Sequence, residues 1–178
     1  EAVACNIPGF DYQEAYEAIH RNAHEPGDPA GTYGRVGLDE FCQLGYVPSD
    51  IPYSVSRTLD FAYSDWCVAQ VAQRLGHEED AKGLLKRSGN YRHLWHTERQ
   101  FMCPRNRNGS WAEPWHEFTW GNPYIEGGPW QHSFNVPHDV QGLAELCGGT
   151  AGLAERLKQV ITTPPHYNIG VYGNEIHE

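Results

Sequence analysis

The sequence is poor in positive charge. It has 13 Lys plus Arg residues against 23 Asp plus Glu, which gives a formal net charge of −10 over 178 residues. A protein that binds nucleic acid needs a basic surface to meet the phosphates. The charge balance therefore excludes a nucleic-acid partner, and it is compatible with bound cations and neutral substrates.

Cysteine and long apolar runs are also scarce. The five cysteines are scattered and form no C-x-x-C pair; they occupy positions 5, 42, 67, 103 and 147. An odd, irregular set argues against a disulfide scaffold, and the missing pairs argue against a zinc knuckle. No run of 18 apolar residues occurs, so no membrane-spanning segment is predicted.

A third absence is the alternation of strands and helices that marks parallel sheets. The periodicity predicts a mostly α chain, with helices at residues 11–24, 38–44, 54–75, 78–95, 137–147 and 151–160. In the strongest of these, 54–75, we expect Ser54 or Ser56 to cap the start and Gly76 to end the helix. Paired helices with long aromatic, glycine-rich loops suggest part of a helical toroid, because these helices are too few to close a ring of twelve.

The most informative segment is YIEGGPWQHSFNVPHDVQGL, residues 124–143. It places Glu126 beside two glycines and Trp130. Glycine lets the backbone come close to a ligand, and tryptophan offers a flat apolar face. A carboxyl group in such surroundings suits a general acid. The combination is common where proteins handle sugars.

This segment also carries a family likeness. Together with LGYVPSD (44–50), SVSRTLDFAYSDWCVAQVAQRLG (54–76), FMCPRNRNGSW (101–111) and IGVYGNEIHE (169–178), it resembles glycoside hydrolase family 92, the calcium-dependent, exo-acting, inverting α-mannosidases. The resemblance implies an (α/α)6 catalytic domain, of which residues 1–178 would be a central section without the N-terminal β-sandwich domain and the end of the toroid. It also implies a mannose-containing glycan as substrate, the remainder of the same domain as partner, and a secreted, periplasmic or cell-surface location.

The resemblance assigns one catalytic residue. An inverting glycosidase needs a general acid and a general base, about 6.5–9.5 Å apart to admit a water. The glutamate of the family's EG-x-x-WQ motif is the general acid, and it falls on Glu126. The family's general base comes from an Asp pair downstream of the last residue, Glu178. We therefore expect the chain alone to be inactive.

The family's Asn-Glu motif binds Ca²⁺, and it falls on Asn174 and Glu175. Oxygen ligands suit this hard cation, although Gly-Asn is also an ordinary turn signal. Tyr172 and Gly173 precede the motif where many members have a histidine, often as His-Glu or His-Gly, in a residue pair that contacts the leaving-group sugar in α-1,2-specific members. This departure puts α-1,2 specificity in doubt and leaves another linkage, or a mannosyl-phosphate linkage, as an alternative.

The resemblance further implies that six residues of the matching loops contact substrate: Arg105, Trp111, Trp130, Gln131, His138 and Asp139. Structural roles compete with this assignment. Arg105 could pin a loop through an ion pair, His138 could be a hydrogen-bonded structural histidine, and Asp139 could cap a helix that starts at Pro137. Two rival functions stay open: a non-catalytic carbohydrate-binding helical domain, and a toroid of another glycosidase family.

Overall fold

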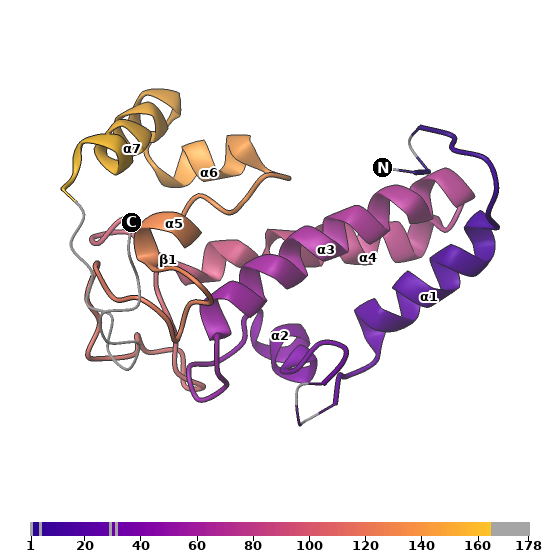
Figure 1. Ribbon diagram of the computed structural model, residues 1–178, viewed down its shortest axis with the longest axis horizontal. Helices are drawn as coiled ribbons and strands as arrows, with labels where there is room; N and C mark the ends of the chain where they lie inside the picture. Colours follow the sequence, from indigo (N-terminus) through magenta and orange to yellow (C-terminus); the bar gives the residue numbers. More distant parts are fainter. Residues whose placement is uncertain (1, 4, 29, 31, 165–178) are drawn as a thin grey trace.

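A computed structural model describes residues 2–3, 5–28, 30 and 32–164. The fold is elongated, and the long helix α3 (Ser54–Leu75) runs through its centre (Figure 1). Helices α1 (Tyr12–His24) and α4 (Glu78–Ser88) pack along the far half of α3. The loop-rich part of the chain gathers at the end where α3 begins. The predicted mostly α architecture of paired helices is confirmed.

Helix α3 begins and ends where its periodicity predicts, but its cap is different. Tyr53 is the N-cap residue, in a left-handed conformation with φ 59°, and no side chain caps the helix. The prediction of a Ser54 or Ser56 cap is therefore wrong. Distant backbone takes over this role, because the Val55 N–H donates to the Pro123 carbonyl at 3.2 Å. Gly76 ends the helix in a left-handed conformation, as expected.

The second helix of the pair is shorter than predicted. The pattern predicts one helix over 78–95, but α4 ends at Ser88 and continues as a 3-10 helix, η1 (Gly89–Leu94). Gly89 stands at the change, which fits its low helix propensity. The chain then forms a two-stranded antiparallel ribbon of β1 (Trp95–His96) and β2 (Phe101–Met102).

Three helices follow the ribbon in the described residues up to 164. Helix α5 (Pro129–His132) is a single turn that the sequence pattern does not predict. Helix α6 (Val140–Leu146) starts three residues later than predicted, because Asp139 is its N-cap and accepts a hydrogen bond from the Gly142 N–H at 2.8 Å. Pro137 therefore lies before the helix. Helix α7 (Thr150–Thr162) packs against α6 and extends the predicted range at both ends.

Two apolar clusters of described residues hold the fold together. The larger joins α2 (Leu38–Leu44), the first half of α3, η1, β2 and α6, and its fully buried side chains include Phe41, Leu59, Tyr91 and Tyr124. The smaller joins α1, α3 and α4. No helix in the described ranges is long and apolar enough to cross a membrane.

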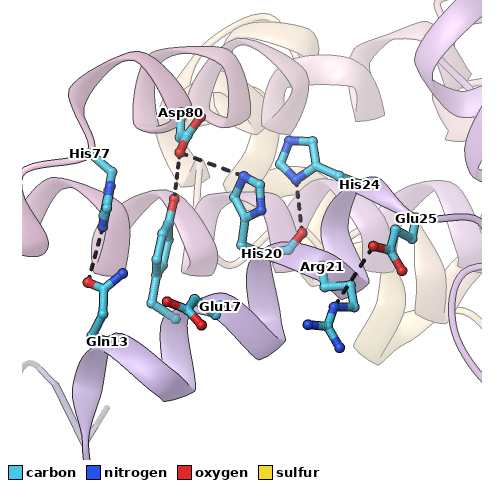
Figure 2. Close-up of a pocket in the computed structure, with 9 residues that line it drawn as sticks. Gln13, Glu17, His20, Arg21, His24, Glu25, His77 and Asp80 are labelled. Carbon is cyan, nitrogen blue, oxygen red and sulfur yellow. Dashed lines mark hydrogen bonds and ion pairs between the residues drawn. The ribbon is translucent and has the colours of Figure 1, made fainter.

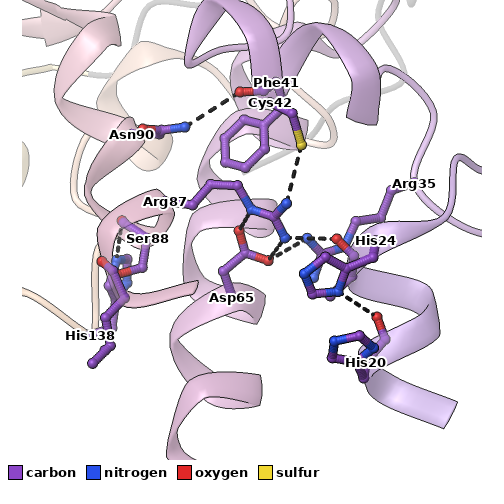
Figure 3. Close-up of polar contacts among 12 residues, drawn as sticks. His20, His24, Arg35, Phe41, Cys42, Asp65, Arg87, Ser88, Asn90 and His138 are labelled. Carbon is purple, nitrogen blue, oxygen red and sulfur yellow. Dashed lines mark hydrogen bonds and ion pairs between the residues drawn. The ribbon is translucent and has the colours of Figure 1, made fainter. Parts of the chain in front are cut away.

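A buried ionic cluster ties the helices between these two cores (Figure 3). Asp65 of α3 is fully buried and accepts hydrogen bonds from Arg35 and from Arg87 of α4. Arg87 also donates to the Ala23 carbonyl at the end of α1, at 2.7 Å, and to the sulfur of Cys42 in α2. One carboxylate thus fixes the positions of four helices. Asp65 therefore has a structural role.

Candidate active site

Glu126 lies in the tight loop of residues 121–128, which connects the aromatic segment after β2 to α5. Tyr124, whose ring is fully buried, anchors the loop to the core. The Tyr124 hydroxyl donates to the Met102 carbonyl of β2 at 2.7 Å and accepts from Nε1 of Trp115 at 3.1 Å. An anchor two residues before Glu126 leaves the loop little freedom to shift.

The Glu126 side chain itself is exposed and its backbone is strained. Its φ of 47° is in the left-handed region, which costs a non-glycine residue about 1 kcal/mol. No hydrogen bond or ion pair holds its carboxylate within the part of the chain that the structure describes. The carboxylate is thus free to meet a ligand, while the backbone beneath it is in a conformation that its neighbours must enforce.

Close packing requires glycine at position 128. A Cβ on Gly128 would lie 2.2 Å from the Thr119 carbonyl oxygen, so only glycine fits there. The Gly128 N–H donates to Oε1 of Gln131 at 3.0 Å, and the Gly127 carbonyl accepts from the Gly121 N–H at 2.8 Å. Gln131, predicted to contact substrate, therefore braces the loop with one of its amide atoms.

Trp130 forms part of an aromatic cluster behind the loop. Its ring meets the Phe101 ring edge-on at a centroid distance of 4.9 Å, and the Arg156 guanidinium of α7 lies 4.9 Å from its centroid. The indole is half-buried, and its Nε1 has no hydrogen-bond partner among the described residues. The predicted sugar contact of Trp130 stays a prediction, and a packing role is visible beside it.

Arg105 and Trp111 come together as a pair. The guanidinium lies 4.5 Å from the indole centroid, a cation–π contact. Its nitrogens donate to the carbonyls of Gly109 and His93, at 3.1 and 3.3 Å. Arg105 therefore pins its loop through carbonyls and aromatic faces. Among the described residues it forms no ion pair, so the form of pinning predicted from sequence is not the one observed.

His138 and Asp139 lie at the start of α6 and point to different partners. Nε2 of His138 is 3.1 Å from the Ser88 carbonyl at the end of α4, as Figure 3 shows. Asp139 accepts from the Tyr91 hydroxyl at 2.6 Å and from Arg92 at 3.3 Å. Burial works to raise the pKa of Asp139, but the bonds from Tyr91 and the α6 backbone and the charge of Arg92 outweigh it and lower the pKa. Both residues hold α6 against η1 and α4.

The described residues do not assemble all the candidates into one cluster. Glu126, Trp130 and Gln131 share a loop and its support, and Arg105 contacts Trp111, but no hydrogen bond or ion pair joins Glu126 to the other described candidates. Asn174 and Glu175 lie outside the described residues. Within the described ranges, no three His, Cys, Asp or Glu side chains come close enough to hold a metal ion.

A separate polar hollow of about 420 Å³ lies between α1 and α4 (Figure 2). The Tyr16 hydroxyl donates to Asp80 at 2.9 Å, and His20 lies 3.6 Å from the same carboxylate. Burial, the bond to Asp80 and its charge raise the pKa of Tyr16 to about 12. Burial and neighbouring cationic groups lower the pKa of His20, against the opposing charge of Asp80. None of the predicted site residues that the structure describes lines this hollow.

Sequence reasoning missed the residues that support the loop from α3 and α5. Ser56 bonds the Ile125 N–H at 2.9 Å, and His132 bonds the Ile125 carbonyl at 2.8 Å. The only available signal is that both lie in segments already matched to the family. Nothing in their local pattern separates a support for Glu126 from a helix-cap serine or a surface histidine.

Comparison with known proteins identifies the family. Residues 1–177 match the glycosyl hydrolase family 92 catalytic domain. The chain belongs to this family, as its motifs predict. A curated relative described as an uncharacterized secreted glycosidase, from Arthroderma benhamiae, is 29% identical over 93% of this chain. The chain spans 25% of that relative's length.

Solved structures of the same family share the fold. A family GH92 inverting mannosidase from Bacteroides thetaiotaomicron matches with a TM-score of 0.83 and 34% identity, over 94% of this chain and 23% of that one. A GH92 alpha-mannosidase of the same organism, solved in complex with mannoimidazole, matches with a TM-score of 0.81 and 33% identity, over 92% and 22%. These neighbours confirm the assignment of the chain to a helical toroid of this family.

Proposed function

We propose that the chain is the section of an inverting exo-α-mannosidase that carries the general acid, Glu126. The observation that carries the proposal is the conformation of Glu126: an exposed carboxylate on a backbone with φ 47°, braced on both sides by hydrogen bonds. Membership of family 92 and the resemblance to mannosidases support the substrate class. A secreted relative supports a secreted location.

In this proposal Glu126 donates its proton to the glycosidic oxygen as the bond to the mannose breaks. Tyr124 and the glycines hold the loop so that the carboxyl faces the substrate. The family's general base, an Asp pair, matches no acidic pair in residues 1–178, and we propose that these residues alone are inactive. Trp130, Gln131, Arg105, Trp111, His138 and Asp139 remain proposed substrate contacts.

The proposed metal is Ca²⁺, held partly by Asn174 and Glu175. An amide and a carboxylate oxygen fit a hard cation, and further oxygen ligands would have to complete the shell. When bound, the ion would orient mannose hydroxyls near the anomeric carbon.

The test uses the complete gene product and aryl α-mannosides and mannobioses as substrates. Glu126→Gln keeps the size of the side chain and removes its acid function, so activity on mannobiose is expected to fall about 10²- to 10⁴-fold. A calcium chelator is expected to abolish activity, and added Ca²⁺ to restore it. Activity that survives both changes would refute the mechanism. Cleavage of mannosyl phosphate but not mannobiose would favour the alternative linkage.

A further inference from the structure

The backbone of Ile125, the residue before Glu126, is held at both of its polar groups. Its N–H donates to Oγ of Ser56, at 2.9 Å, and its carbonyl oxygen lies 2.8 Å from Nε2 of His132. The two side chains also contact each other, because Oγ of Ser56 is 3.2 Å from Nδ1 of His132. The three residues form a closed ring of hydrogen bonds.

The chemistry of the ring fixes one proton position. The Ile125 carbonyl can only accept, so Nε2 of His132 carries a proton and donates to it. Oγ of Ser56 accepts from the Ile125 N–H and also lies within hydrogen-bond distance of Nδ1 of His132. Ser56 is 1% exposed, so water cannot cheaply replace the partners of its hydroxyl, whereas the bond between His132 and the Ile125 carbonyl is exposed.

The ring acts where the backbone needs support. Glu126 follows with φ 47°, a conformation that an unconstrained loop would leave. Glycine at position 127 leaves room for the His132 side chain of the ring, since a Cβ there would lie 3.0 Å from Nε2 of His132. Ser56 belongs to the rigid first turns of α3 and His132 to α5, so the ring connects the loop to two helices.

We propose that Ser56 and His132 are positioning residues for Glu126: their hydrogen bonds to Ile125 hold the carboxyl in the orientation from which it protonates the leaving group. The proposal rests on the proposed role of Glu126 as general acid. Neither residue takes part in proton transfer to the substrate. Their removal weakens the acid by misplacing it, and a displacement of about 1 Å can cost roughly 10²-fold in rate.

If Ser56 and His132 only stabilised the fold, the effect of their removal would not depend on the leaving group of the substrate. Substrates with different leaving groups therefore distinguish a positioning role from a stabilising role. A dinitrophenolate leaves with little protonation, whereas a methoxyphenolate depends on the acid. A misplaced acid therefore slows methoxyphenyl α-mannoside far more than dinitrophenyl α-mannoside. Loss of folded protein lowers kcat/KM for both substrates by one factor, so their ratio does not depend on how much enzyme is active.

The experiment measures this ratio in the complete gene product. Ser56→Ala and His132→Leu are expected to lower kcat/KM for the methoxyphenyl substrate about 10- to 100-fold, mainly through kcat, and to change the dinitrophenyl value by less than about 3-fold. His132→Gln, whose amide nitrogen reaches about as far as Nε2, is expected to restore much of the ratio.

Ser133→Ala is the matched control. The Ser133 side chain is also 1% exposed, and its Oγ also accepts a backbone N–H at 2.9 Å, that of Met102. This variant loses the same kind of bond at Met102 rather than at Ile125, and it is expected to change the ratio far less than Ser56→Ala does. If Ser56→Ala and Ser133→Ala lower both substrates equally, the positioning role is wrong.

The Glu126→Gln variant shows how strongly the rate depends on the leaving group when the acid is lost. It also distinguishes the proposed acid role of Glu126 from the proposed positioning role of Ser56 and His132. A strong dependence on the leaving group in Glu126→Gln, with none in the Ser56 and His132 variants, overturns only the positioning role. If Glu126→Gln shows no such dependence, the acid assignment itself fails. Should His132→Leu not fold, Ser56→Ala and His132→Gln still decide the question, because the ratio requires only a measurable active fraction.

Discussion

The buried carboxylate of Asp65 offers a sharp test of the fold, because its removal leaves two cations without their anionic partner. Asp65 has no exposed side-chain surface, and the side chains of Arg35 and Arg87 are 5% and 15% exposed. Arg35 donates to Oδ1 at 2.6 Å, and Arg87 donates to the same oxygen at 2.9 Å. Asp65→Asn keeps the volume but replaces a doubly paired anion with a neutral amide.

The expected cost follows from the unpaired charges. Removal of one member of a buried ion pair destabilises a protein by about 3–5 kcal/mol, since the remaining charge stays out of water. With a urea m value of about 2 kcal/mol/M, the unfolding midpoint should fall by about 1.5–2.5 M. The measurement is urea unfolding of the complete gene product and its variant, followed by tryptophan fluorescence.

Asp60→Asn is the matched control on the same helix. The Asp60 side chain is exposed, and Asn135 bonds it at 3.5 Å. Its replacement should change the free energy of unfolding by less than about 1 kcal/mol. Equal midpoint shifts for the two variants would refute the account of Asp65 as the residue that joins α1, α2, α3 and α4.

Three further predictions concern the start of α6 and the middle of α4. A Cβ on Gly142 would lie 2.1 Å from both Arg92 Nη2 and Asp139 Oδ2, so Gly142→Ala should destabilise by about 2 kcal/mol or more in urea unfolding. Gly83→Ala in α4 meets nothing within 4 Å and should stabilise by up to about 1 kcal/mol; a loss there would contradict the packing argument. Folding lowers the pKa of Asp139 below its ordinary 3.8, so its contribution is complete above that value and is lost as pH falls through the lower, folded pKa. Asp139→Asn should therefore reduce the loss of stability between pH 5 and pH 2, measured by thermal unfolding; an unchanged acid limb would show that Asp139 is not linked to folding.

Local sequence patterns predict the long elements of this fold and fail at their junctions. The range of α3 follows from a sustained apolar period and a terminal glycine, both of which act within the helix itself. Its N-terminal cap does not follow from the local pattern, because the N–H groups of Tyr53 and Val55 donate to Oδ1 of Asn122 and to the Pro123 carbonyl. A partner almost 70 residues away leaves no trace in the periodicity. The single turn α5 is too short to show any period at all.

The candidate site, too, was predicted from sequence only in part. The motif around Glu126 identifies a carboxylate that the structure places on an exposed, strained turn. The supports of that turn could not be predicted, because Ser56 resembles a helix cap and His132 resembles a surface residue. Asp139 illustrates the converse: sequence left substrate contact and helix capping open, and the hydrogen bond from Gly142 establishes the capping role. Its proposed contact with substrate stays a prediction.

Helix α3 performs two tasks at separate places, and this separation makes them independently testable. Ser56 holds the Glu126 loop at the first turn, while Asp65 holds the ionic cluster nine residues further on, about 14 Å along the helix axis. Changes at this distance without shared partners are expected to be additive. Asp65→Asn should therefore lower stability while leaving the methoxyphenyl-to-dinitrophenyl ratio unchanged. Ser56→Ala should alter that ratio at a much smaller cost in stability. If Asp65→Asn changed the ratio as strongly as Ser56→Ala, the orientation of Glu126 would depend on the whole helix bundle, and the local ring around Ile125 would not be its cause.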